Sequence, residues 1–118
     1  MIDFELRDGL AQVRLNRPAR RNALTCGMLE RLAEVFKGIA ARTDLRAVIL
    51  SGEGSAFCGG TDIEELAALD VEGARRAAER GQEVCDLIER CGVPVIAAIQ
   101  GAAAGGGCES ALGCHLRV

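Results

Sequence analysis

The sequence predicts an α/β fold in which buried parallel strands alternate with crossover helices. Residues 47–50 and 95–99 are short apolar runs bounded by turn-forming residues, a pattern typical of buried parallel strands. Residues 25–40 and 71–91 have helical periodicity, and each stretch precedes one of these runs. A helix between two such strands indicates a parallel crossover, because parallel neighbours need a long connection.

The chain begins with a predicted β-hairpin. Residues 2–7 and 10–15 carry apolar side chains at alternate positions, and Asp8-Gly9 lies between them. An Asp-Gly pair flanked by alternating runs is a strong hairpin signal, because these residues tolerate the positive φ angles of a two-residue turn. Pro18 closes the second strand, since proline cannot donate to a sheet.

A helix follows the hairpin, with Thr25 as its expected N-terminal cap. Its apolar positions follow the i, i+3, i+4, i+7 pattern of a packed helix face: Leu29, Leu32, Ala33, Phe36, Ile39 and Ala40. Residues 71–91 predict a second, longer helix, which ends at Gly92. Residues 113–118 are expected to start one more strand.

Two stretches, 56–66 and 94–112, share one organisation: an apolar strand, a glycine turn and a helix start. The second turn is the triplet 105–107. Such turns leave backbone N–H groups bare, with no side chain to keep a ligand away. Glu109 lies just inside the second helix, and a carboxylate beside exposed donors can move a proton while an oxyanion is stabilised. Alternatively, the glycines only allow tight packing of strand against helix.

The start of the helix after the first turn has two possible caps. Thr61 and Glu64 have the spacing of a capping box, in which the Glu64 carboxylate accepts the Thr61 N–H. That arrangement withholds the N–H from any ligand. Asp62 as the cap leaves it free. The sequence permits both.

Several other function classes have little support. The net charge of −3, and the absence of Trp and Tyr, argue against a nucleic-acid or membrane-surface role. The dinucleotide pattern fails because Ser110 stands at its third glycine, and a phosphate-binding loop fails because Cys108, not Lys, follows the glycines. The single histidine, His115, has no evident acid partner for a hydrolytic triad.

The six cysteines form no CxxC pair, so a metal site has little ligand support. We expect buried, reduced thiols in a cytoplasmic protein, since the chain also lacks the pattern of a secretory signal and any run of membrane-spanning length. The chain, at 118 residues, has the size of one domain.

Arg17, Arg20 and Arg21 make the connection before the first helix basic. This connection is either a solvated loop or a contact for a phosphorylated ligand, because arginine suits phosphate oxygens.

Three ordered motifs give the chain a resemblance to the enoyl-CoA hydratase/isomerase (crotonase) family. They are VRLNRP with NAL at residues 13–24, FCGGTDI at residues 57–63, and PVIAA running into GGGCE at residues 94–109. The resemblance covers essentially the whole chain. It implies a crotonase-like ββα spiral of which residues 1–118 are an N-terminal, incomplete portion, because members of the family are longer.

The resemblance also implies a site. The family's two oxyanion donors fall on the N–H groups of Thr61 and Gly106, and Glu109 matches the first of two glutamates used by the hydratases. The acyl-CoA contacts it implies are Arg20, Gly60, Thr61, Asp62, Ile63, Glu64, Gly105 and Gly106. Coenzyme A is then part of the substrate, so no separate cofactor and no metal are expected.

Three interpretations follow from the resemblance. The first is addition of water to 2-enoyl-CoA thioesters by a homo-oligomer, a trimer or hexamer. The second is double-bond isomerisation or other enolate chemistry on the same fold. The third is a truncated homologue that assembles without catalysis, since the second glutamate of the hydratases lies beyond residue 118.

Overall fold

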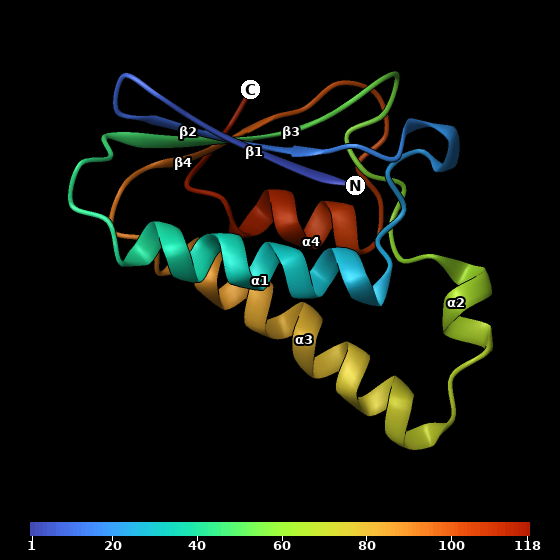
Figure 1. Ribbon diagram of the computed structural model, residues 1–118. Coiled ribbons are helices and arrows are strands. Elements are labelled where there is room, and N and C mark those ends of the chain that lie inside the picture. Colours follow the sequence, from blue (N-terminus) through green and yellow to red (C-terminus); the bar gives the residue numbers. More distant parts are fainter.

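The computed structural model describes all 118 residues as one sheet with helices packed on one of its faces (Figure 1). The strands are β1 (Ile2–Arg7), β2 (Leu10–Leu15), β3 (Ala47–Gly52), β4 (Val95–Ala98) and β5 (Leu116–Arg117), in that spatial order. The helices are α1 (Cys26–Ala40), α2 (Ile63–Ala67), α3 (Val71–Glu89) and α4 (Gly106–Gly113), with a 3-10 turn at Pro18–Arg20. The predicted α/β class is confirmed.

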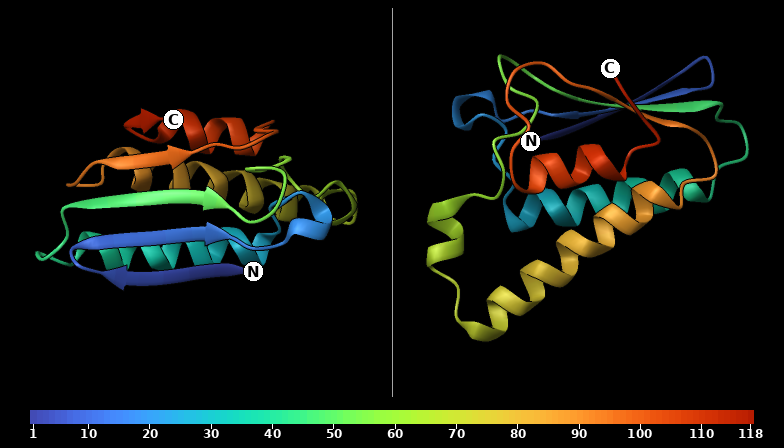
Figure 2. Two further views of the ribbon diagram at one scale, coloured as in Figure 1. Left: turned by 90° about the horizontal axis from the view of Figure 1, so that it is seen from above. Right: turned by 180° about the vertical axis from the view of Figure 1, so that it is seen from behind.

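The sheet combines one hairpin with three parallel pairings. β1 and β2 are antiparallel, whereas β2–β3, β3–β4 and β4–β5 are parallel. Asp8 and Gly9 form the hairpin turn with φ angles of 50° and 80°, as the Asp-Gly pair predicts. α1, α3 and α4 supply the crossovers of the parallel pairs, and Figure 2 shows them on the same side of the sheet.

The core lies between the sheet and these helices. Val13, Leu50 and Ala97 are opposite one another in adjacent strands, and all three are buried. Phe36 of α1 and Ile88 of α3 close the core from the helical layer. Burial alternates along β2 and β3, so one face of each strand meets the helices and the other remains half-exposed.

α1 and α3 differ in how much of their length the sheet covers. Thr25 caps α1, as predicted, by accepting the Met28 N–H at 3.1 Å, and seven residues of α1 are buried. In α3 only Val84 and Ile88 are buried. Its first half slants away from the sheet, on the side of α2 (Figure 1), which leaves small residues of α3 free to line a cavity.

Residues 56–58 differ from the strand expected there. They form no strand, and Cys58 makes only an isolated bridge to Ala103. The reason is that the buried Asn22 amide donates to the carbonyl oxygens of Ala56 and Phe57, at 2.8 and 3.2 Å. A side chain therefore takes the place of a neighbouring strand.

The expectation of buried thiols is only partly right. All six cysteines are free, but only Cys58 and Cys114 are buried, and Cys108 is exposed. His115 has a structural place: its Nδ1 accepts the Val95 N–H and its Nε2 lies 2.9 Å from the Glu89 carbonyl oxygen. No cluster of His, Cys, Asp and Glu could hold a metal ion, and no helix is long and apolar enough to cross a bilayer.

Candidate active site

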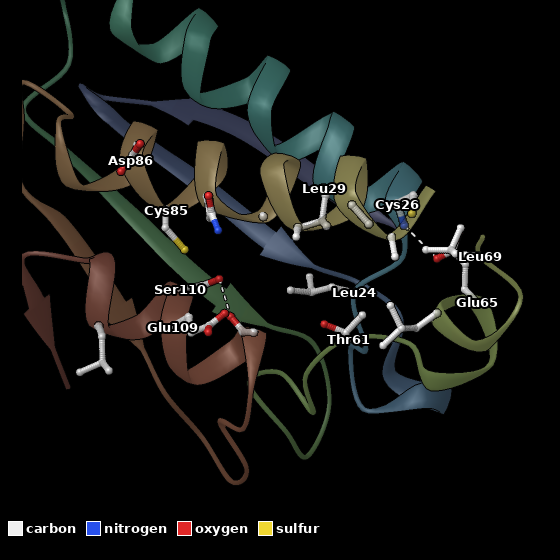
Figure 3. A pocket seen from close by; sticks show the side chains of 18 residues that line it. Leu24, Cys26, Leu29, Thr61, Glu65, Leu69, Cys85, Asp86, Glu109 and Ser110 are labelled. Carbon is white, nitrogen blue, oxygen red and sulfur yellow. Dashed lines mark hydrogen bonds between the residues drawn. The ribbon is translucent and has the colours of Figure 1, made fainter. Parts of the chain in front are cut away.

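A cavity of about 620 Å³ lies between α3, α4, the start of α1 and the segment around α2 (Figure 3). Ten of its eighteen lining residues are hydrophobic. Thr61, Gly106 and Glu109, which the sequence marks as candidate catalytic residues, all line it. The two glycine turns thus meet at one concave site, as ligand pockets of open α/β sheets do.

The backbone around Thr61 directs its N–H away from the neighbouring chain segment. The Leu24 N–H donates to the Gly60 carbonyl at 2.7 Å, and the Asp62 N–H donates to the Leu24 carbonyl at 2.9 Å. Successive amides of an extended segment point in opposite directions, so the Thr61 N–H points away from Leu24. It donates to no protein acceptor.

Asp62 is the N-terminal cap of α2. Its Oδ1 accepts the Glu65 N–H at 2.9 Å, and its Oδ2 accepts from Arg17 Nη1 at 2.7 Å. The Glu64 carboxylate pairs with Arg20 at 3.0 Å and has no bond to Thr61. Of the two caps that the sequence permits, the structure therefore has the one that leaves the Thr61 N–H free.

The second amide comes from Gly106, the first residue of α4. Its N–H also lacks a protein acceptor, whereas the Gly107 N–H donates to Ala104 at 2.8 Å. A Cβ atom added to Gly106 would lie 4.0 Å from the Thr61 nitrogen, so the two free amides belong to one end of the cavity. Gly60 and Gly105 make this approach possible, since both have positive φ angles and their backbones abut.

Glu109 lies in the first turn of α4, and its side chain lines the cavity (Figure 3). It is exposed and forms no ion pair with a basic residue. Ser110 beside it turns back, and its hydroxyl donates to the Gly106 carbonyl at 2.7 Å. Burial, together with the charge of Glu109, raises the pKa of the nearby Cys85 thiol. Glu109 is thus available to exchange a proton within the cavity.

The other predicted contact residues lie outside the cavity lining. The Asp62 side chain is only 5% exposed and bonded on both oxygens, and the Glu65 N–H and the Arg17 guanidinium hold its pKa below the usual range. Ile63 points into solvent, at 79% exposure. Arg20 is half-exposed and engaged with Glu64.

Sequence reasoning missed two further carboxylates of the cavity, Glu65 and Asp86. Glu65 Oε2 accepts the Cys26 N–H at 2.9 Å and so ties α2 to the start of α1. Asp86 continues the line of Ala78 and Gln82 along one face of α3, and this i, i+4 spacing is the sequence signal that could have identified it.

Comparison with known proteins identifies the family whose sequences this chain resembles. The sequence profile of the enoyl-CoA hydratase/isomerase family matches residues 5–118. A Bacillus subtilis (strain 168) protein named "Probable enoyl-CoA hydratase" is 42% identical over 104 residues, which are 87% of this chain and 40% of that protein. The human mitochondrial Delta(3,5)-Delta(2,4)-dienoyl-CoA isomerase is 37% identical over 116 residues, covering 89% of this chain and 35% of the isomerase.

Solved structures that share this fold come from the same family. The crystal structure of an enoyl-CoA hydratase from Bacillus anthracis superposes with a TM-score of 0.94 at 35% identity, over 98% of this chain and 46% of that one. The chain therefore spans less than half the length of the relatives it matches. With the profile matching nearly every residue and the crotonase fold shared, this chain belongs to the enoyl-CoA hydratase/isomerase family.

Proposed function

We propose that the cavity binds the thioester end of an acyl-CoA and stabilises its enolate for hydration of 2-enoyl-CoA. One observation carries this proposal: the unbonded N–H groups of Thr61 and Gly106 belong to one end of a cavity that also contains Glu109. Free amides beside a carboxylate match the needs of a reaction that builds charge on a carbonyl oxygen while a proton moves.

In this mechanism the thioester oxygen accepts hydrogen bonds from both amides. Attack of water at C3 moves electron density onto that oxygen, so the two bonds strengthen as the transition state forms. Backbone hydrogen bonds from Leu24 to Gly60 and from Gly107 to Ala104 hold the two turns, so both amides are oriented before the substrate binds. Removal of one such donor typically costs about 10²–10³ in rate, roughly 3–4 kcal/mol.

Glu109 is proposed to orient the water or take its proton. The apolar lining, which includes Leu24, Leu29 and Leu69, is proposed to hold the acyl chain. Arg20 is proposed to approach the phosphates of coenzyme A, because it lies on the surface beside the α2 turn, and its ion pair with the exposed Glu64 can open. Coenzyme A enters as part of the substrate. A homo-oligomer in the cytoplasm remains our proposal for the assembled protein.

Isomerisation of an enoyl-CoA is the second candidate. It is favoured by the 37% identity to a protein named as a dienoyl-CoA isomerase. The same two amides would stabilise the enolate, and a carboxylate would move a proton between two carbons instead of activating water. A homologue that assembles without turnover is the third candidate.

Assays with 2-enoyl-CoA and 3-enoyl-CoA thioesters separate these candidates, with calorimetric binding of an acyl-CoA measured in parallel. We expect consumption of the 2-enoyl substrate and a fall of at least about 10²-fold in the Glu109→Gln variant. Glu34→Gln is the matched control, because Glu34 is exposed on α1 and pairs only with Arg31. Hydration that persists in Glu109→Gln contradicts the assigned role. Turnover of the 3-enoyl substrate alone supports isomerisation, and an absence of acyl-CoA binding supports the third candidate.

A further inference from the structure

Two mutually exclusive caps compete for the start of α2, and they treat the Thr61 amide in opposite ways. In the observed arrangement Asp62 is the cap, and Thr61 precedes the helix with its N–H free. In the alternative, Thr61 is the cap, the helix begins one residue earlier, and the Glu64 carboxylate accepts the Thr61 N–H. The free amide of the cavity therefore depends on which cap prevails.

We propose that Asp62 is a positioning residue: by capping α2 it excludes the Thr61–Glu64 capping box and keeps the Thr61 amide available to the cavity. Its importance for catalysis rests on the proposed oxyanion role of Thr61. The state of the amide itself does not depend on that role.

One intrinsic preference and two contacts favour the Asp62 cap. Asp is intrinsically a better N-terminal cap than Thr. Arg17 Nη1 bonds both the Asp62 carboxylate, at 2.7 Å, and the Ala23 carbonyl, at 2.9 Å, and so fixes Asp62 to the segment that pairs with Thr61. The Asp62 N–H donates to the Leu24 carbonyl, and Asp62 itself has an extended conformation, with φ −64° and ψ 111°. Asp62 would lose this conformation if it became the first helical residue.

The Glu64 carboxylate, which would accept the Thr61 N–H in the capping box, is engaged in an ion pair. Glu64 lies on the exposed side of α2, where its carboxylate pairs with Arg20 at 3.0 Å. Arg20 Nη2 also lies 3.9 Å from Asp62, so one cation faces both carboxylates. Without the Asp62 side chain, α2 loses its cap, and the exposed Glu64 carboxylate, whose surface pair with Arg20 can open, becomes the acceptor within reach of the Thr61 N–H.

Amide hydrogen exchange of Thr61, followed by NMR, tests the proposal without any substrate. In the wild type we expect no protection at Thr61, and protection at Asp62, whose N–H is bonded to Leu24 and serves as the internal reference. Asp62→Ala should protect Thr61 by about tenfold, the effect of gaining one hydrogen bond. Asp62→Ala/Glu64→Ala should remove that protection again, because the acceptor is gone. Asp62→Asn keeps a good cap and should leave Thr61 unprotected.

A protected Thr61 in the wild type overturns the proposal, and so does an unprotected Thr61 in a folded Asp62→Ala variant. If Asp62→Ala does not fold, a protected Thr61 in Asp62→Asn likewise overturns the proposal. The catalytic consequence is measured separately: because the Thr61 amide would then be free about one tenth of the time, Asp62→Ala should lower kcat by about tenfold, with a smaller change in KM, and the double variant should recover part of it. The expected exchange pattern in a protein that binds no acyl-CoA refutes the proposed function and leaves the role of Asp62 standing.

Discussion

Gly106 and Gly107 are adjacent in the sequence, but a methyl group has different consequences at each. At Gly106 a Cβ would approach the flexible end of Leu24, at 3.3 Å, and Thr61 Oγ1, at 3.6 Å. At Gly107 it would overlap the backbone carbonyl of the buried Cys58, which cannot move aside.

We therefore expect Gly106→Ala to fold and to lose about 10²-fold in kcat/KM, because the methyl group narrows the space in front of the two amides. Gly107→Ala should instead lose about 2–3 kcal/mol of unfolding free energy through overpacking. Gly38→Ala is the control, since a Cβ there meets nothing within 4 Å, and it should stabilise α1 by roughly 0.5–1 kcal/mol. Urea denaturation and thioester assays measure both effects. Equal stabilities for the Gly106 and Gly107 variants would contradict this distinction.

The pKa of Asp62 gives a prediction with a definite sign. The Glu65 N–H and the Arg17 guanidinium lower it in the folded protein. A carboxylate with a lowered native pKa stabilises the fold above its unfolded pKa of about 3.9, and this contribution is lost as the pH falls through the native value. Asp62→Asn should therefore be less stable than the wild type at neutral pH. Thermal melts should show the two proteins converging below about pH 4, and parallel curves would be inconsistent with this account.

At the scale of elements, the segment 17–24 fixes the loop that leads to the first glycine turn. The buried Asn22 amide donates to three carbonyls, those of Glu53, Ala56 and Phe57, at 2.8–3.2 Å, and its Oδ1 accepts the Arg17 N–H. Residue 22 has a φ of 56°, a conformation that asparagine tolerates better than most residues. One side chain thus joins two segments that lie side by side without forming strands.

Asn22→Ala should cost roughly 3 kcal/mol of unfolding free energy, because it leaves several buried carbonyls without a donor. Asn16→Ala is the matched control: its amide bonds the exposed Asp3 carboxylate, and its loss should cost less than about 0.5 kcal/mol. Chemical denaturation compares the two. A loss in Asn22→Ala no larger than in Asn16→Ala would show that the loop holds its conformation without this amide.

At the scale of the whole molecule, the free cysteines report how the layers are packed. Cys108 is exposed on α4, whereas Cys58 and Cys114 are buried between the layers. Burial raises the pKa of the Cys114 thiol to about 11, so almost none of it is thiolate at pH 8. Because the folded protein disfavours the thiolate, the Cys114 thiol supports the free energy of unfolding fully below about pH 9, and this support is lost as the pH rises toward 11.

A thiol reagent at pH 8 should therefore modify Cys108 rapidly and Cys58 and Cys114 only after global unfolding. Mass spectrometry of the labelled peptides, with and without denaturant, identifies each site. Labelling of Cys114 as fast as that of Cys108 in the native protein would mean that α4 separates from the sheet.

Apart from the strand expected at residues 56–58, the sequence alone determined the elements and their order. The Asp8-Gly9 turn, the Thr25 cap and the apolar runs of β3 and β4 depend on neighbouring residues, so local chemistry was sufficient to predict them. It also singled out the two glycine turns and Glu109, because glycine turns before helix starts can expose amides, and the family resemblance placed the two donors on Thr61 and Gly106.

Tertiary structure alone decided whether those residues form a site. Residues 56–58 have the composition of a strand, yet Asn22, more than thirty positions away, takes their carbonyls. Thr61 and Glu64 have the spacing of a capping box, yet Arg17 holds Asp62 in place as the cap. In both cases two local preferences of similar strength compete, and a contact with a residue distant in sequence decides between them. Such partners meet only when the sheet has formed, so no local pattern contains the result.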